Sequence, residues 1–65
     1  MKLIVNGEAR EVSAATLAEL LEELEYEGAW LATAVNGELV RVEERPACRI
    51  SEKDRIEILS PMQGG

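Results

Sequence analysis

The stretch Thr16-Leu17-Ala18-Glu19-Leu20-Leu21-Glu22-Glu23-Leu24-Glu25 decides the fold, because it carries the most secure helix signal in the chain. Its leucines recur at the spacing i, i+3, i+4 and i+7, which places all of them on one helical face. Thr16 and Glu19 fit a capping box, in which the hydroxyl accepts from the Glu19 N–H and the carboxylate accepts from the Thr16 N–H. Gly28 lies where a helix stop belongs, so we predict a helix over about residues 17–25.

The segment before the helix predicts a β-hairpin. Residues 3–5 and 9–12 flank Asn6-Gly7-Glu8, and Asn-Gly is the strongest short hairpin signal because both central residues of a type I′ turn need positive φ. Alternation divides the first strand into two faces, with Leu3 and Val5 on one and Lys2 and Ile4 on the other.

The segment after the helix predicts a second hairpin, because residues 30–35 and 38–42 flank Asn36-Gly37. The tetrapeptide Val5-Asn6-Gly7-Glu8 recurs word for word at residues 35–38. The sequences around the two copies do not match further, so similar turn chemistry explains the recurrence better than an internal duplication.

The remainder of the chain predicts a connector and a final strand. Residues 43–54 are charged and interrupted by Pro46, and we expect one short strand at Cys48-Arg49-Ile50 and a turn at residues 51–54. Residues 55–60 form the last strand, with Ile56 and Ile58 on one face and Glu57 and Leu59 on the other. Pro61 cannot donate to a sheet ladder, so pairing should stop there.

These elements predict a two-layer α+β domain over residues 1–60, because one helix with one apolar stripe covers one face of one sheet. Residues 61–65 are expected to form a flexible tail. Pattern alone leaves the strand order open. With 46% apolar residues, 3% aromatic residues and no Phe, the core should be aliphatic. Trp30 and Tyr26 are the only large rings, and we expect them to pack in the core or at the helix edge rather than to stack on nucleic acid.

The composition excludes several classes of function. The side-chain charge is 7 minus 13, or −6, which opposes nucleic-acid binding and favours partners with a basic docking surface. Cys48 is the single cysteine, so no internal disulfide can form, and we expect a reducing cytoplasmic location. No stretch resembles a signal peptide or approaches the length of a membrane span.

Few residues could carry catalysis. The chain has no His, no Gly-rich phosphate loop with a lysine and no Asp-rich calcium loop, so we expect no metal site and no bound cofactor. Glu22 and Glu23 are better interpreted as a solvated acidic face than as a catalytic pair. Cys48 lacks a histidine to activate it and is interpreted as a packing residue. We therefore expect no catalytic site in this chain.

The end of the chain, Pro61-Met62-Gln63-Gly64-Gly65, offers chemistry of another kind. A carboxylate is a poor electrophile, but its reaction with ATP yields an acyl-adenylate, from which a sulfur nucleophile can displace AMP and leave a thiocarboxylate. Gly64 and Gly65 lack Cβ atoms and could thread a narrow channel. Five extended residues after Ser60 reach roughly 17 Å, enough to enter a partner's active site. The alternative is a frayed end without function.

The whole chain resembles the ThiS family, the small sulfur carriers of thiamine (thiazole) biosynthesis. The resemblance is carried by residues 3–8, 16–21 and 34–40, and above all by residues 54–65. It implies a ubiquitin-like β-grasp fold, a mixed sheet of four to five strands packed against one main helix. In this fold the first and last strands pair in parallel at the sheet centre.

The resemblance also implies a reaction cycle. A ThiF-type enzyme would use ATP and Mg²⁺ to adenylate the Gly65 carboxylate, with Gly64 as its slim neighbour. Sulfur drawn from cysteine through a desulfurase would convert Gly65 to a thiocarboxylate. Thiazole synthase of the ThiG type would take up that sulfur. The chain would thus be a cosubstrate rather than an enzyme.

Three other functions stay open at this point. One is a MoaD-like sulfur carrier for molybdopterin, although such chains are usually longer and often richer in Phe. The second is a ubiquitin-like modifier joined through Gly65 to lysines of its targets. The third is a plain interaction domain with an incidental tail.

For a carrier, strand alternation predicts a partner-binding patch on the sheet face turned away from the helix. Ile4, Leu59 and Met62 would supply its apolar part, beside the tail residues Pro61 and Gln63. Glu57 would steer a basic partner toward it.

Overall fold

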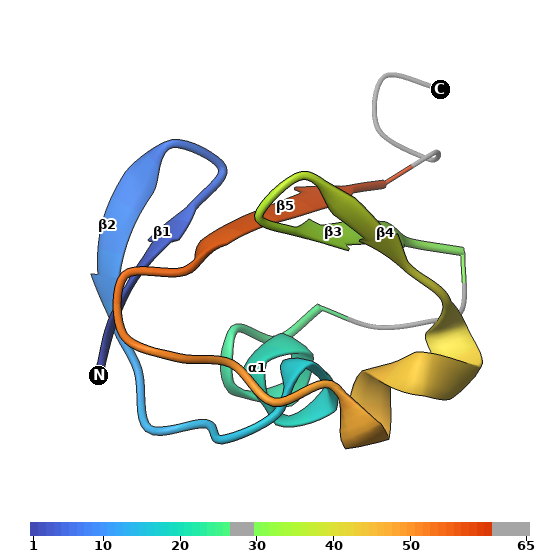
Figure 1. Ribbon diagram of the computed structural model, residues 1–65, viewed down its shortest axis with the longest axis horizontal. Coiled ribbons are helices and arrows are strands. Elements are labelled where there is room, and N and C mark those ends of the chain that lie inside the picture. Colours follow the sequence, from blue (N-terminus) through green and yellow to red (C-terminus); the bar gives the residue numbers. More distant parts are fainter. Residues whose placement is uncertain (27–29, 61–65) are drawn as a thin grey trace.

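The computed structural model, which describes residues 1–26 and 30–60, consists of one mixed sheet covered on one face by a helical layer (Figure 1). The sheet has the order β2-β1-β5-β3-β4. Its strands are β1 (Lys2–Val5), β2 (Glu8–Glu11), β3 (Ala32–Val35), β4 (Glu38–Val40) and β5 (Arg55–Leu59). The helical layer contains α1 (Leu17–Glu23) and the short 3₁₀ helix η1 (Val42–Ala47).

The last strand, β5, lies at the centre of the sheet between the two hairpins. It runs parallel to β1, with Ile4 opposite Arg55 and Val5 opposite Ile56. It runs antiparallel to β3, from Ala32 opposite Leu59 to Val35 opposite Ile56. This arrangement is the β-grasp fold that the family resemblance implied.

Both Asn-Gly sequences form the predicted hairpin turns. Asn6 and Gly7 have φ values of 50° and 84°, and Asn36 and Gly37 have φ values of 52° and 86°. All four residues thus lie in the left-handed region that a type I′ turn requires. In Figure 1 the two hairpin tips point toward each other across β5.

The start of α1 confirms half of the predicted capping box. The Glu19 N–H donates to the Thr16 hydroxyl at 3.2 Å, as expected. The Glu19 carboxylate, however, accepts from the Ala15 N–H at 2.9 Å and not from that of Thr16. Thr16 forms an isolated antiparallel bridge with Arg49, which holds this segment extended and turns the Ala15 N–H toward the carboxylate. A short strand was predicted around Arg49, but the structure has only this single bridge there.

The helix ends earlier than predicted, because Glu25 and not Gly28 provides the stop. Glu25 has a φ of 66°. Its N–H donates to the Glu22 carbonyl at 3.0 Å, and the Tyr26 N–H donates to the Leu21 carbonyl at 2.9 Å. These two bonds define a Schellman motif, which satisfies carbonyls of the last helical turn. Tyr26 packs against the core and fixes the motif, whereas Gly28 lies outside the described residues.

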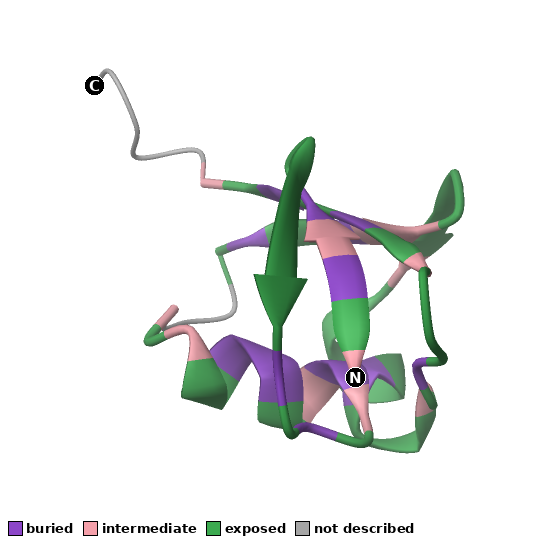
Figure 2. Cartoon of the chain, turned by 90° about the vertical axis from the view of Figure 1, so that its left-hand side faces the viewer, coloured by how far each residue is buried: buried purple, intermediate pink, exposed green. Residues whose placement is uncertain are grey.

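The core is aliphatic, as predicted, and lies between the sheet and the helical layer. It is formed by Leu3, Val5, Val12, Ala14, Leu17, Leu20, Leu21, Leu31, Ile50, Ile56 and Ile58. Figure 2 shows that β1 alternates between buried and exposed positions, whereas β2 is exposed along its length. The expectation that Trp30 packs was wrong, because its side chain is 77% exposed. Leu31 turns inward in its place, so its neighbour Trp30 faces solvent.

The connector contains a helix where a strand end and irregular chain were expected. Strand β4 ends at Val40, and η1 starts at Val42 and includes Pro46. The Glu44 carboxylate accepts from the Arg41 N–H at 3.0 Å, and the Glu44 N–H donates back to the Arg41 carbonyl at 2.9 Å. This reciprocal local bonding favours the turn of helix over a longer strand. The predicted turn at residues 51–54 is present, with the Asp54 N–H donating to the Ser51 carbonyl.

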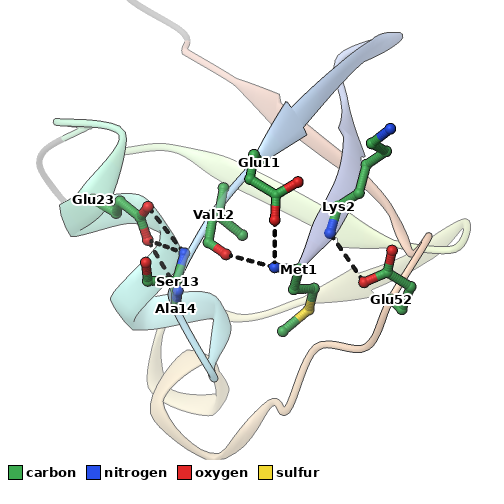
Figure 3. A network of polar contacts seen from close by, with 8 residues as sticks. All are labelled: Met1, Lys2, Glu11, Val12, Ser13, Ala14, Glu23 and Glu52. Carbon is green, nitrogen blue, oxygen red and sulfur yellow. Dashed lines mark hydrogen bonds and ion pairs between the residues drawn. The ribbon is translucent and has the colours of Figure 1, made fainter.

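Each hairpin is tied to the helical layer by one charged side chain. Figure 3 shows the Glu23 carboxylate of α1 accepting from the N–H groups of Ser13 and Ala14 at 2.9 to 3.0 Å, just after β2. On the other side, the Arg45 guanidinium of η1 donates to the Leu31 carbonyl and to the Thr33 hydroxyl, just before and within β3. Arg45 is only 5% exposed, whereas the bonds of Glu23 lie near the surface.

The amino-terminal edge of β1 carries further polar contacts. The Met1 ammonium group donates to the Glu11 carboxylate at 2.7 Å and to the Val12 carbonyl at 3.0 Å, and the Lys2 N–H donates to Glu52 (Figure 3).

Within residues 1–26 and 30–60, no helix is long and apolar enough to cross a membrane.

Candidate functional site

The predicted acceptor segment follows directly from the central strand. Strand β5 ends at Leu59, and the chain passes through Ser60 into Pro61, Met62, Gln63, Gly64 and Gly65. Those last five residues lie outside the described part of the chain, so their predicted roles stay predictions. The segment therefore begins at the end of the central strand of the sheet, which has one hairpin on each side.

The remaining predicted docking residues lie on the sheet face turned away from the helical layer. Glu57 and Leu59 are exposed, and they alternate with the buried Ile56 and Ile58. Ile4 is half-buried and lies opposite Arg55, whose side chain is exposed on that same face. The structure thus brings Ile4, Glu57 and Leu59 to the predicted face, while Met62 lies outside the described residues.

Sequence reasoning missed the larger apolar part of this face. Leu59 is 68% exposed, and Leu39 on β4 is 72% exposed. Together with Glu57, they line a small hollow of about 80 Å³ that also includes residues of β3. We define the apolar patch as Ala32, Ala34, Leu39 and Leu59. Alternation along β3 could have indicated part of it, because Ala32 and Ala34 share one face, and the register then places Ala32 opposite Leu59 and Ala34 opposite Leu39.

A second hollow separates the two hairpin tips and has a volume of about 460 Å³. It is open and mixed in polarity, and Arg55 and Glu57 bring opposite charges to it. Its lining consists of Ile4, Gly7, Asn36, Gly37, Arg55, Ile56 and Glu57. These residues include no thiol, hydroxyl or imidazole that could act as a nucleophile, so the hollow is better suited to contact than to catalysis.

The chain matches the model of the ThiS family over residues 3–65. The chain belongs to the ThiS family. The match spans the hairpins, the helix and the two terminal glycines, so it covers both the described body and the segment after β5.

Two solved structures from Geobacter metallireducens are similar to this ThiS-family chain. The crystal structure of the thiamine biosynthesis protein ThiS is 33% identical, covers 100% of both chains and gives a TM-score of 0.83. The solution NMR structure of a thiamine biosynthesis protein is also 33% identical and gives a TM-score of 0.80, covering 100% of this chain and 88% of that one. No curated protein matches the chain.

Cys48 does not have the environment of a reactive thiol in this ThiS-family chain. It is half-buried and packs against the core. Burial raises the pKa of the Cys48 thiol above its ordinary value, and the negative charges of Asp54 and Glu44 raise it further. The thiol is therefore protonated at neutral pH, which disfavours nucleophilic attack.

The described residues also offer no group of three or more carboxylates or thiols placed to hold a metal ion. The described body places β5 at the centre of its sheet, and the chain continues from that strand toward Gly65.

Proposed function

We propose that this chain is a sulfur carrier of thiamine biosynthesis, with the carboxylate of Gly65 as the group that receives and delivers sulfur. The observation that carries the proposal is the ThiS-family match over residues 3–65, which ends on Gly64 and Gly65. The two similar structures, both of thiamine biosynthesis proteins, support the same pathway. The geometry supports it because the central strand β5 leads into this segment.

The proposed chemistry begins with activation of the carboxylate. A ThiF-type enzyme, with ATP and Mg²⁺, joins a Gly65 oxygen to the α-phosphate of ATP and releases pyrophosphate. AMP is a far better leaving group than a carboxylate oxygen. The terminal sulfur of a persulfide, supplied from cysteine through a desulfurase, then displaces AMP to form an acyl disulfide, and attack by a thiol on this disulfide releases the thiocarboxylate and leaves a new disulfide. Thiazole synthase of the ThiG type takes this sulfur into the thiazole ring.

In this cycle the chain is a cosubstrate and its partners supply the catalysis. Gly64 keeps the end slim enough to enter the adenylation site, since it has no Cβ. The nucleotide and Mg²⁺ belong to the activating enzyme. A reducing cytoplasm suits both the single Cys48 and a thiocarboxylate, which oxidation would destroy.

We further propose that the enzymes dock on the outer sheet face. Ile4, Leu59 and Met62 supply apolar contact, and Glu57 attracts a basic surface of the enzyme. The exposure of Leu59 and Glu57 on one face supports this assignment. The net charge of −6 supports association that weakens as salt is added.

The test is the intact mass of the chain after incubation with ATP, a ThiF-type enzyme and a sulfur source. We expect one terminal oxygen to be replaced by sulfur. A chain that lacks Gly65 should show no replacement and serves as the control. An unmodified chain in the presence of an enzyme proven active on another carrier would overturn the proposal.

Complementation assigns the pathway. The gene should restore growth to a strain that lacks its thiamine sulfur carrier and should not restore a strain that lacks the molybdopterin carrier. Rescue of the molybdopterin strain alone would assign the chain to that pathway instead. High-molecular-weight conjugates that depend on Gly65 would indicate a protein modifier.

A further inference from the structure

Trp30 is the largest exposed apolar side chain of the described body, and neither the fold nor the proposed chemistry uses it. Its side chain is 77% exposed, and it is absent from the core cluster and from the residues packed against that cluster. An indole exposed to this extent gains little from hydrophobic burial and leaves a large apolar area in water. Its stabilising contribution to the body should therefore be small.

The strand register places Trp30 at the end of the sheet where β5 ends. Ala32, the first residue of β3, lies opposite Leu59, the last residue of β5, and Trp30 precedes Ala32 by two positions. Two residues span at most about 7 Å and paired strands lie about 5 Å apart. The Trp30 backbone is therefore within roughly 12 Å of Leu59, the last residue of β5.

The length of chain beyond this point limits where a partner can act. Gly65 lies six positions after Leu59, which is a reach of at most about 20 Å. An enzyme that holds the Gly65 carboxylate in a covered nucleotide site must therefore press its surface against the body around the end of β5. Trp30, Leu59 and Leu39 are the most exposed large apolar residues there, at 77%, 68% and 72%.

Resting on the proposed function, we propose that Trp30 is an anchor residue for the adenylating enzyme, seated in an apolar pocket of that enzyme when Gly65 is engaged. A Trp near the centre of an interface is the residue type that most often dominates binding energy. Trp30 thus adds a third exposed large apolar side chain to Leu59 and Leu39, near the end of β5.

Steady-state adenylation kinetics test this assignment by pyrophosphate release. We expect Trp30→Ala to raise the KM for the carrier by about tenfold or more, in the range found for anchor residues. The value of kcat should change little, because Trp30 does not touch the reacting atoms. Trp30→Phe keeps an aromatic ring and should recover much of the loss. Thermal melting should be nearly unchanged in both variants, since the indole lies outside the core.

A binding measurement tests the contact without chemistry. Trp30 is the only tryptophan in the chain, so labelling the chain with 5-fluorotryptophan gives one ¹⁹F resonance that reports on this position alone. We expect the resonance to shift and broaden when the ThiF-type enzyme is added. It should do so also for a chain without Gly64 and Gly65, which cannot be adenylated but keeps the docking surface.

The outcomes separate the two proposals. A wild-type chain that the enzyme never adenylates overturns the proposed function. A wild-type chain that is adenylated, together with an unchanged KM for Trp30→Ala and an unperturbed ¹⁹F resonance, overturns the role of Trp30 and leaves the carrier function intact.

Discussion

The two hairpins carry the same tetrapeptide, Val-Asn-Gly-Glu, and the same turn geometry, yet each uses its asparagine differently. The Asn6 amide accepts from the Ile58 N–H at 2.8 Å and donates to the Ile58 carbonyl at 3.2 Å. The Asn36 amide accepts from the Arg55 N–H at 2.9 Å and donates to the Asp54 carboxylate at 3.0 Å. One asparagine thus holds the end of β5 and the other holds its start.

The difference follows from strand direction. Strand β1 is parallel to β5, so the turn that follows β1 places Asn6 beside the later residues of β5. Strand β3 is antiparallel to β5, so the turn that follows β3 places Asn36 beside the first residues of β5. The Asp54 carbonyl accepts from the Ile4 N–H of β1, and the Ile56 carbonyl accepts from the Asn6 N–H just after β1. The same alternation points the backbone groups of Ile58 beyond the end of β1. The Asn6 amide takes the place of the missing peptide group there.

The two hairpins also differ in the polarity of the side chains that they expose to solvent. The β3–β4 side carries the exposed Leu39 and is followed by the exposed Val42, whereas β2 exposes Glu8, Ala9, Arg10 and Glu11. Strand β5 therefore has a hairpin with exposed apolar residues on one side and a hairpin with an outer charged strand on the other. The same turn motif therefore occurs in one hairpin that exposes apolar side chains and in another whose edge strand is charged, which discourages edge pairing.

The largest contrast should come from the charged ties to the helical layer. Arg45→Ala should lower the free energy of unfolding by about 2–3 kcal/mol, since it removes a buried side chain and leaves the Leu31 carbonyl without its donor. Glu23→Ala, the matched change on the other hairpin, should lower it by about 1 kcal/mol because its bonds are near the surface. Urea denaturation of both variants measures the difference, and equal losses would contradict it.

The asparagines should differ next. Asn6→Gly and Asn36→Gly both keep a residue that accepts positive φ and add the same flexibility to the unfolded chain, so the difference between them reports the lost amide contacts. We expect a loss of about 2 kcal/mol for Asn6→Gly, which strips partners from the partly buried Ile58 backbone, and about 1 kcal/mol for Asn36→Gly. Amide hydrogen exchange gives a local check, because exchange at Ile58 should rise only in Asn6→Gly. A rise in both variants would contradict the assignment.

The outer faces should differ in partner binding. Leu59→Asp and Leu39→Asp, on the apolar patch, should each lower kcat/KM for adenylation about tenfold, equivalent to about 1.4 kcal/mol. Ala9→Asp, which lies opposite Ile4 on the exposed strand β2, should lower kcat/KM by less, because it is farther from β5 and from the apolar patch. Circular dichroism melts would verify that all three variants fold. Comparable losses from Ala9→Asp would show that docking does not favour the β3–β4 side.

The smallest effect concerns pH. Glu11 raises the pKa of the Met1 ammonium group through a hydrogen bond and its charge, and the same contact lowers the pKa of Glu11. The raised amine pKa gives stability that is present below the ordinary value of about 8 and is lost as pH rises through the folded value. The lowered carboxyl pKa gives stability that is present above about 4.3 and is lost as pH falls through its folded value.

Glu11→Gln should therefore reduce the melting temperature slightly near pH 6 and by less at the acidic and alkaline extremes. The effect is small because the pair is exposed to solvent. Melting curves of the unchanged chain and of Glu11→Gln, recorded from acidic to alkaline pH, provide the check. A difference that is constant with pH would show that the ion pair does not contribute.

Much of the candidate surface followed from strand alternation, which placed Ile4, Glu57 and Leu59 on the outer face. The alternation of β4 also places Leu39 on this face, although the sequence prediction did not include it. Trp30 was assigned to packing because large apolar residues are usually buried, and nothing in its neighbours shows that Leu31 takes the inward position. Arg45 could not be identified either, since a charged residue is expected at the surface and its burial depends on acceptors 12 to 14 residues away.

The sequence by itself determined the helix, the two type I′ turns and the alternation of β5, because these depend on residues within about four positions of one another. Only the tertiary structure decided that Glu25 ends the helix, that Arg45 is buried and Trp30 exposed, and that identical turns hold opposite ends of β5. Those outcomes depend on which segments meet across the sheet and the core. Contacts such as that between Asn6 and Ile58, 52 residues apart, arise only when the whole chain packs.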